Sequence, residues 1–190
     1  MKQIPFLILG ILLFLSCQQQ IGKIKVEKVE VNCEKLNDSA MYMLAEQSFA
    51  NSVKLINFAI ECDPNNNVYI RNKGMILANA GLYKGCISHL EKNKKQYTTI
   101  ERLSTTAECY FQIKDKAMFD SFKKQALINS TQEFNKRRNE STLIIHLTTL
   151  KKFDGEYRML ETLKENKSLF NSHDMYFHMI KFLEKIPTLK

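Results

Sequence analysis

Histidine, cysteine and serine are the side chains of this sequence that could bind a metal or act as nucleophiles, and their spacing supports neither chemistry. Two of the four histidines, His173 and His178, are five residues apart, whereas two ligands on one face of a helix are four apart. No serine lies in a nucleophile-elbow sequence, and the glycines do not form a phosphate-binding loop. The sequence therefore predicts that the protein is not an enzyme, holds no metal and needs no cofactor.

The amino terminus has the composition of an export signal. Lys2 supplies a short positive region, and residues 4–15 are almost wholly apolar up to Ser16 and Cys17. This run is shorter than the roughly 20 apolar residues that cross a bilayer. A small residue followed directly by cysteine resembles a bacterial lipoprotein cleavage site, which implies removal of residues 1–16 and lipid attachment at Cys17. An uncleaved hydrophobic anchor is the alternative, and either reading holds the protein at a membrane.

Residues 17–32 are expected to form the lipidated amino terminus and a tether. Imperfect alternation of apolar and charged residues between Ile24 and Val31 is compatible with an extended segment, but we favour a linker. In the Bacteroidetes, acidic residues next to the lipidated cysteine resemble a surface-export signal, and none stands next to Cys17. The expected location is therefore the cell envelope, on the outer membrane and facing the periplasm.

Composition favours one helical domain after this leader. Residues 17–190 are enough for a single domain with a buried core. The chain is 44% hydrophobic and has no Trp, six Gly and three Pro, which suits a compact all-helical domain better than a β-sandwich. Its net charge of +8 is scattered over separate lysines and arginines, as on solvated helix faces. We expect the partner of this basic surface to be an acidic protein or anionic lipid, and not nucleic acid.

A pattern of about 34 residues recurs between residues 33 and 128. Copies that begin at Cys33, Asn67 and Ile100 share a small residue at the eighth place and a bulky apolar residue at the eleventh. These residues are Ala40, Gly74 and Ala107 at the eighth place, Met43, Leu77 and Tyr110 at the eleventh, and Ala59 and Ala126 at the twenty-seventh. Pro64 lacks an N–H and would end the second helix of the first copy. The pattern resembles the tetratricopeptide repeat, a helix–turn–helix unit that stacks with its neighbours.

This resemblance implies an all-α fold, a right-handed superhelical stack of antiparallel helix pairs. Residues 33–128 would form three repeats, and residues 129–190 a degenerate fourth repeat and a carboxy-terminal capping helix. Asn93, Phe119 and Lys123 depart from the pattern, because the family prefers small residues at the first two places and a large apolar residue at the third.

Helical patterns continue beyond residue 128. Ser130 and Glu133 have the spacing of a capping box, which predicts a helix start there. An apolar stripe then recurs through residues 143–150, and Asp154 and Gly155 interrupt it. A last helix over residues 172–186 would cover the end of the stack. Its Met and Phe face could instead be a binding surface, since such faces adapt to varied partners.

The repeat register also bears on the cysteines. Cys33, Cys62, Cys86 and Cys109 are an even number, which permits disulfides in an oxidising compartment. In the register, Cys86 takes a place that is normally small and buried, and Cys109 falls on the next helix. A Cys86–Cys109 disulfide is one possibility, and we favour packing of both as small hydrophobic residues.

Members of the resembled family bind proteins in a groove lined by the first helix of each repeat. Carried over by place, the predicted lining is Asn37, Met41 and Leu44 from the first copy, Arg71, Met75 and Asn79 from the second, and Glu108, Phe111 and Gln112 from the third. Asn37 and Met41 stand where the chaperone-type branch needs Lys and Asn, so binding of a chaperone tail is disfavoured.

The expected function is therefore a membrane-anchored protein–protein interaction module that binds a peptide or helix of an unknown protein. Two alternatives are an immunity or inhibitor lipoprotein that neutralises a periplasmic toxin, and an assembly factor for an envelope complex.

Overall fold

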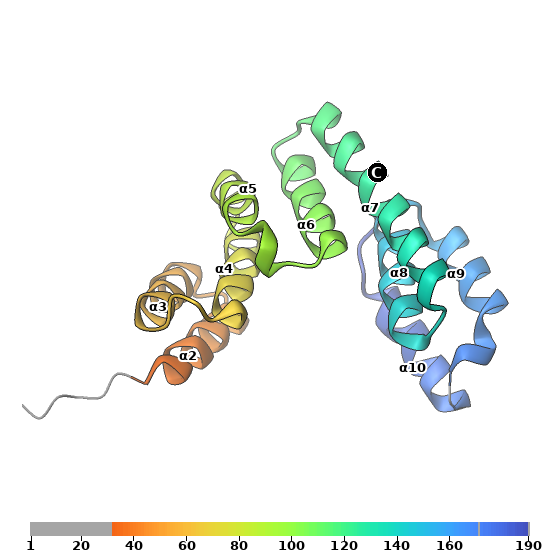
Figure 1. The fold of residues 1–190 in the computed structure, drawn as a ribbon, viewed down its shortest axis with the longest axis horizontal. Coiled ribbons are helices and arrows are strands. Elements are labelled where there is room, and N and C mark those ends of the chain that lie inside the picture. The colour runs from red at the N-terminus through yellow and green to blue at the C-terminus, as the bar shows by residue number, and fades with distance from the viewer. Residues whose placement is uncertain (1–31, 171, 190) are drawn as a thin grey trace, which may run out of the picture. The chain divides into compact units, whose positions relative to one another are not determined.

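The computed structural model describes residues 32–170 and 172–189 of the chain. Within these ranges the protein is built from nine α-helices and two short 3-10 helices, without a strand (Figure 1). The helices are α2 (Cys33–Ala45), α3 (Phe49–Cys62), α4 (Asn67–Asn79), α5 (Tyr83–Lys92), η2 (Lys94–Gln96), α6 (Thr99–Gln112), α7 (Lys116–Arg137), α8 (Glu140–Phe153), α9 (Glu156–Glu165), η3 (Lys167–Leu169) and α10 (His173–Glu184). The predicted all-α class is confirmed.

The predicted leader, the lipid attachment site Cys17 and almost all of the tether lie outside the described residues. Among the helices that are described, none combines the length and the apolar composition needed to cross a membrane.

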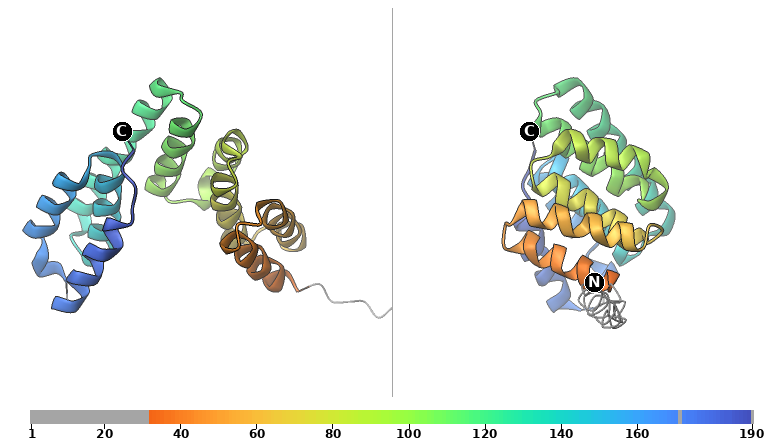
Figure 2. Two further views of the ribbon diagram at one scale, coloured as in Figure 1. Left: turned by 180° about the vertical axis from the view of Figure 1, so that it is seen from behind. Right: turned by 90° about the vertical axis from the view of Figure 1, so that its left-hand side faces the viewer.

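Short turns join the helices into hairpins, which the two views in Figure 2 show from different sides. α2 packs against α3, α4 against α5, α6 against α7 and α8 against α9. The predicted copy starts agree with this division, because Cys33 and Asn67 begin α2 and α4, and Ile100 is the second residue of α6. Polar caps start these helices: Asn32, Asn66 and Thr98 each accept a hydrogen bond from a backbone N–H of the first turn.

The turn inside each of the first three hairpins has the same backbone geometry. Gln47, Gly81 and Lys114 have positive φ angles of 55°, 73° and 61°, and each is the fifteenth residue of its copy. The next residue then donates its N–H to a carbonyl five residues back, as in a Schellman motif. These bonds run from Ser48 to Met43 (2.8 Å), from Leu82 to Leu77 (3.0 Å) and from Asp115 to Tyr110 (3.0 Å). The repeat is therefore present in the backbone as well as in the residue pattern.

The small eighth-place residues lie in the tight contact within each hairpin. Ala40, Gly74 and Ala107 are all buried. In the first copy, the Ser52 hydroxyl donates to the carbonyl of Ala40 at 2.8 Å, and in the second the Cys86 thiol donates to the carbonyl of Gly74 at 3.4 Å. Ser52 and Cys86 stand at the twentieth place of their copies. The third copy has Phe119 at the twentieth place, and its ring packs against Phe111 and Phe153 instead.

One predicted helix start is wrong. Ser130 lies inside α7, where its hydroxyl donates to the carbonyl of Leu127 at 3.0 Å, so Ser130 and Glu133 do not form a capping box. The cap lies further on: Asn139 accepts from the backbone N–H of Thr142, and the Thr142 hydroxyl accepts from the N–H of Asn139. The boundary expected after residue 128 consequently falls within α7. The Ser130 hydroxyl can bond back to its own helix, so a capping-type spacing does not by itself start a helix.

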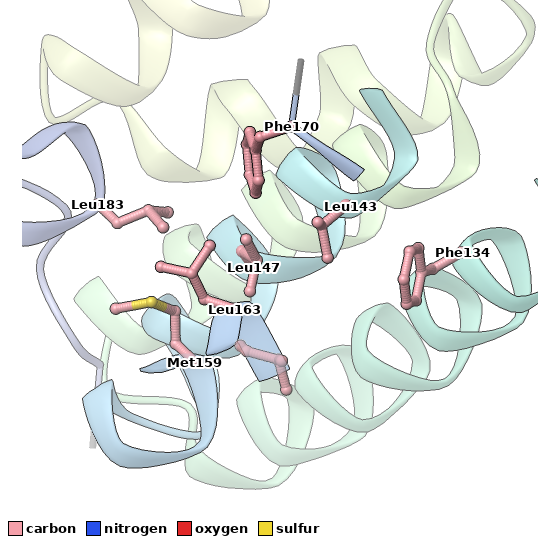
Figure 3. Packing of buried hydrophobic residues seen from close by; sticks show 8 residues of the cluster. Phe134, Leu143, Leu147, Met159, Leu163, Phe170 and Leu183 are labelled. Atoms are coloured by element: carbon pink, nitrogen blue, oxygen red, sulfur yellow. The ribbon is translucent and has the colours of Figure 1, made fainter. Parts of the chain in front are cut away.

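A hydrophobic cluster joins α10 to the α8–α9 hairpin (Figure 3). Leu147, Leu163 and Leu183 are fully buried in it. α10 thus covers the apolar face of this hairpin, as expected of a terminal helix. The chain after α10 returns to α8, where the N–H of Leu189 donates to the carbonyl of Lys152 at 2.8 Å.

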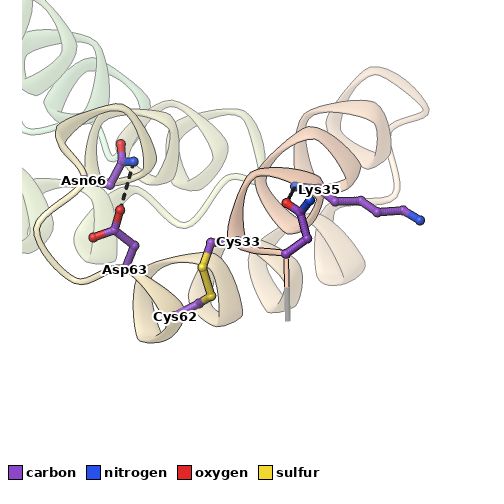
Figure 4. The surroundings of a disulfide bond; sticks show 6 residues. Cys33, Lys35, Cys62, Asp63 and Asn66 are labelled. Carbon is purple, nitrogen blue, oxygen red and sulfur yellow. Dashed lines mark hydrogen bonds between the residues drawn. A yellow bond between two sulfur atoms is a disulfide. The ribbon is translucent and has the colours of Figure 1, made fainter. Parts of the chain in front are cut away.

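A disulfide bond closes the first hairpin. It joins Cys33 at the start of α2 to Cys62 at the end of α3, with the two Cα atoms 5.6 Å apart (Figure 4).

Cys86 and Cys109 are both buried free thiols, as favoured from the sequence. They contact each other, and the hydrogen bond to Cys86 raises the pKa of the Cys109 thiol. The Cys86–Cys109 disulfide is therefore not formed.

Candidate functional site

Polar side-chain bridges link the first helices of successive hairpins. α2 is joined to α4, α4 to α6, and α6 to α8, each by one pair of side chains. The pairs are Asn37–Asn72 (2.8 Å), Arg71–Glu101 (3.1 Å) and Glu108–Lys152. Three of the predicted groove residues, Asn37, Arg71 and Glu108, are thus engaged within the protein itself. Their contacts align the helices that line the predicted groove.

Two adjoining hollows lie between these helices and α10. The larger, of about 690 Å³, lies between the carboxy-terminal parts of α4 and α6, α8, and the end of the chain, and the smaller, of about 390 Å³, lies between α6 and α8. Both are lined by Thr148, Lys152 and Phe182. We call the two hollows together the α6–α8 groove.

The groove combines apolar and hydroxyl-bearing side chains. Ile144, Ile145 and Phe182 supply apolar surface, while Thr98, Thr105 and Thr148 supply hydroxyl groups. Phe182 is 49% exposed, whereas Leu183 next to it is buried in the core of the α8–α9 hairpin. Such a surface can bind an extended or helical segment through apolar contacts and hydrogen bonds. Among the described residues, no three His, Cys, Asp or Glu side chains are placed to hold a metal ion.

Five of the nine predicted lining residues face hollows. Arg71, Asn79, Glu108 and Gln112 line the α6–α8 groove. Met75, 40% exposed, lines a neighbouring hollow of about 360 Å³ with Val68, Arg71, Asn72 and Glu101.

The other four predicted residues do not line these hollows. Asn37 is buried and bonded to Asn72. Met41 and Leu44 pack against the core of the first hairpin, and Phe111 packs on Phe119 with the ring centroids 5.2 Å apart. The burial of each of these places depends on the neighbouring helix as well as on the repeat position. None of these four residues lines the hollows described above.

Sequence reasoning missed the contribution of α8 to the groove. Gly155 has a φ of 102° and donates its own N–H to the carbonyl of Leu150, five residues back. In the earlier hairpins, the equivalent bond is donated by the residue that follows the positive-φ residue. A fourth copy counted from residue 141 gives Gly155 the fifteenth place. Ile145, Thr149 and Lys152 then take groove places, and all three line the smaller hollow. The Asp154–Gly155 break was the signal that could have set this register.

His146, which is buried, and His89, which is half-buried, have structural contacts. The Nδ1 atom of His146 lies 3.1 Å from the Ser130 hydroxyl oxygen, and the His146 ring stacks on Phe134. His89 donates from Nε2 to the carbonyl of Ile70 at 2.8 Å, so its Nδ1 accepts from the Asn93 amide. Burial lowers the pKa of both rings, which favours their neutral form in the folded protein.

We expect this burial to make folding sensitive to mild acid. The unfolded histidines bind a proton near their ordinary pKa of about 6.5, whereas the folded ones bind it only at lower pH. The stability that the neutral rings contribute is therefore complete above about pH 6.5 and is lost as the pH falls towards their lowered pKa. Urea unfolding between about pH 7.5 and 5.5 should show a falling free energy of unfolding.

His146→Gln should flatten this pH dependence, and the part that remains belongs to His89. His178→Gln, which changes an exposed histidine of α10, is the matched control and should keep the slope of the parent. An equal slope for the parent and the His146→Gln protein would contradict the assignment.

Comparison of the chain with protein-family models gave no match, and comparison with curated proteins and with solved structures gave no significant one. The resemblance to the tetratricopeptide repeat therefore stays a prediction from the residue pattern.

Proposed function

We propose that this protein is an exported, lipid-anchored helical-repeat module that binds a segment of another protein in the α6–α8 groove. The observation that carries the proposal is the position of Phe182. This half-exposed ring lines both hollows together with residues of α8, next to Arg71 of α4 and Glu108 of α6. Large aromatic side chains in such hollows are frequent anchors of protein interfaces.

The groove joins two surfaces that the sequence pattern left as alternative binding sites. The first-helix surface and the Met and Phe face of α10 meet at Phe182, so a bound segment would contact both. Bridges such as Arg71–Glu101 hold the first helices in place before binding, which reduces the ordering cost of association. An amphipathic partner segment fits this lining best, because it can cover the Ile and Phe side chains and bond to the Thr hydroxyls.

Two features support export. The apolar run that ends at Ser16–Cys17 has the form of a lipoprotein signal. The Cys33–Cys62 disulfide suits an oxidising compartment, since cytosolic thiols are kept reduced. Together they support a location of the proposed binding module in the cell envelope.

Site-specific photo-crosslinking tests the groove. A benzophenone amino acid at position 182, introduced into the full chain in its native cells, should give one dominant covalent adduct with an envelope protein. Mass spectrometry of the adduct identifies the partner. The additional change Ile145→Glu should reduce the adduct about tenfold or more, because it puts a charge into the apolar part of the groove.

Tyr157, on α9, supplies the matched control. It is 76% exposed and lines none of the groove hollows. The same crosslinker at position 157 should give no adduct with that partner, and Leu160→Glu, also on α9, should leave the position-182 adduct unchanged. Equal yields at positions 157 and 182 would show that the groove is not the binding surface.

A further inference from the structure

A further pocket, separate from the α6–α8 groove, lies between α3, α4 and α5. It has a volume of about 490 Å³ and shares no lining residue with the groove. Its apolar side is formed by Val53, Ile60, Ile70 and Leu77. The polar side chains on its wall are Asn57, Lys73, Ser88, His89, Lys92 and Asn93.

The pocket contains positive charge without a matching acid. Lys73 and Lys92 both line it, and no Asp or Glu is among its lining residues. Neither lysine forms a hydrogen bond or an ion pair with any residue that the structure describes. Lys73 is half-buried; burial and the charge of Lys92 lower its pKa, although Glu61 acts in the opposite direction. A half-buried lysine beside a second, exposed lysine would gain from an anion bound between the two.

Two of the remaining polar side chains already form hydrogen bonds within the protein, and two do not. His89 and Asn93 satisfy each other and the backbone, since His89 bonds to Ile70 and Asn93 bonds to His89. The Asn57 amide and the solvent-exposed Ser88 hydroxyl form no hydrogen bond with the described residues. They can therefore donate to a ligand bound beside the two lysines.

Gly85 leaves free space on the wall of this pocket. It lies within α5 on the pocket wall, and a Cβ atom at this position would meet nothing within 4 Å. A side chain at position 85 could therefore enter the pocket without disturbing the helix, and this gives a test that leaves the fold intact.

We infer that this pocket binds an anion that carries a short apolar chain, with its carboxylate or phosphate group between Lys73 and Lys92 and its chain along Val53, Ile60 and Leu77. Asn57 and Ser88 supply further hydrogen bonds to the anionic group. The site is independent of the proposed function, because the two surfaces share no residue.

Titration of ¹⁵N-labelled protein by NMR tests the site with four probes. Octanoate and octyl phosphate have both a charge and a chain, acetate lacks the chain, and octanol lacks the charge. We expect octanoate or octyl phosphate to shift amide signals confined to α3, α4 and α5, and the preferred one identifies the head group. Acetate and octanol should each bind at least about tenfold more weakly.

Matched variants test whether binding depends on the two pocket lysines or on surface charge in general. Lys73→Met/Lys92→Met should weaken binding of the preferred probe at least about tenfold. Lys94→Met/Lys95→Met removes the same charge from two exposed lysines of η2 that do not line the pocket, and should bind as the parent does. Gly85→Phe should fold normally and abolish binding, while Gly85→Ala should keep it. Circular dichroism melting curves establish that each variant is folded.

The inference is overturned if neither charged amphiphile binds the parent, or if acetate or octanol binds as tightly as they do. Unchanged affinity in Lys73→Met/Lys92→Met or in Gly85→Phe would also overturn it, because the ligand would then lie elsewhere. None of these results changes what is expected for crosslinking at position 182. The proposed anion site and the proposed function of the groove are therefore tested independently.

Discussion

Replacing Cys33 and Cys62 together with serine is expected to lower the free energy of unfolding by about 3.5 kcal/mol. The disulfide closes a loop with a sequence separation of 29, and the loss of its constraint on the unfolded chain gives this estimate. For a domain of this size the melting temperature should fall by about 10 °C. Thermal unfolding with and without a reductant measures the change.

The reductant should destabilise the parent as the double variant does and should have no effect on the double variant itself. Alkylation of the unfolded, unreduced parent followed by mass spectrometry should label Cys86 and Cys109 but neither Cys33 nor Cys62. A chain without residues 2–16 should stay in the cytosol and carry reduced Cys33 and Cys62. An unchanged melting temperature on reduction of the parent would refute the stabilising role of the bond.

The second large effect is expected at Gly74. A Cβ atom there would lie 2.5 Å from the Tyr97 hydroxyl and 3.5 Å from a methyl group of Leu90. Tyr97 is buried, and its hydroxyl donates to the carbonyl of Ile70 at 2.8 Å. Gly74→Leu should therefore lower the free energy of unfolding by about 3 kcal/mol or more through overpacking and the loss of this hydrogen bond. Urea unfolding measures this change.

A double-mutant cycle with Tyr97 makes the cause testable. Gly74→Ala should cost about 1–2 kcal/mol in the parent, because it forces the Tyr97 hydroxyl away from Ile70. In a Tyr97→Phe protein the hydroxyl is absent, so the same change should cost at least about 1 kcal/mol less. Additive effects of the two changes would show that Tyr97 is not the reason for glycine at position 74.

Gly85 is the matched control for this cycle. It is also within a helix, but a Cβ atom meets nothing there. Gly85→Ala should raise the free energy of unfolding by about 0.5–1 kcal/mol, because alanine is the better helix former. The opposite signs expected at Gly74 and Gly85 thus separate close packing from helix propensity.

Local structure in the first three hairpins follows from residues that lie close together along the chain. Asn32, Asn66 and Thr98 cap helices through groups a few residues away, and Gly81 permits the left-handed turn. These signals act within about one helical turn, so they can be read along the chain. The predicted starts at Cys33 and Asn67 agree with the helices for this reason.

The sequence did not show where α7 ends or which predicted groove residues stay accessible. α7 continues through Ser130 because that hydroxyl bonds back to its own helix and Phe134 packs against the next hairpin. Asn37 is buried because Asn72 of α4 lies against it. Both outcomes depend on side chains from another helix, whose distance and direction a residue pattern does not contain.

Tertiary structure alone decided the disulfide and the groove. An even number of cysteines permits several pairings, and Cys33 pairs with Cys62 because the ends of one hairpin meet there. Phe182 reaches the groove because Leu183 is anchored in the α8–α9 core, which fixes how α10 is turned. Local hydrogen bonds and backbone preferences determine the helices, whereas the sites between them depend on contacts between residues far apart in the chain.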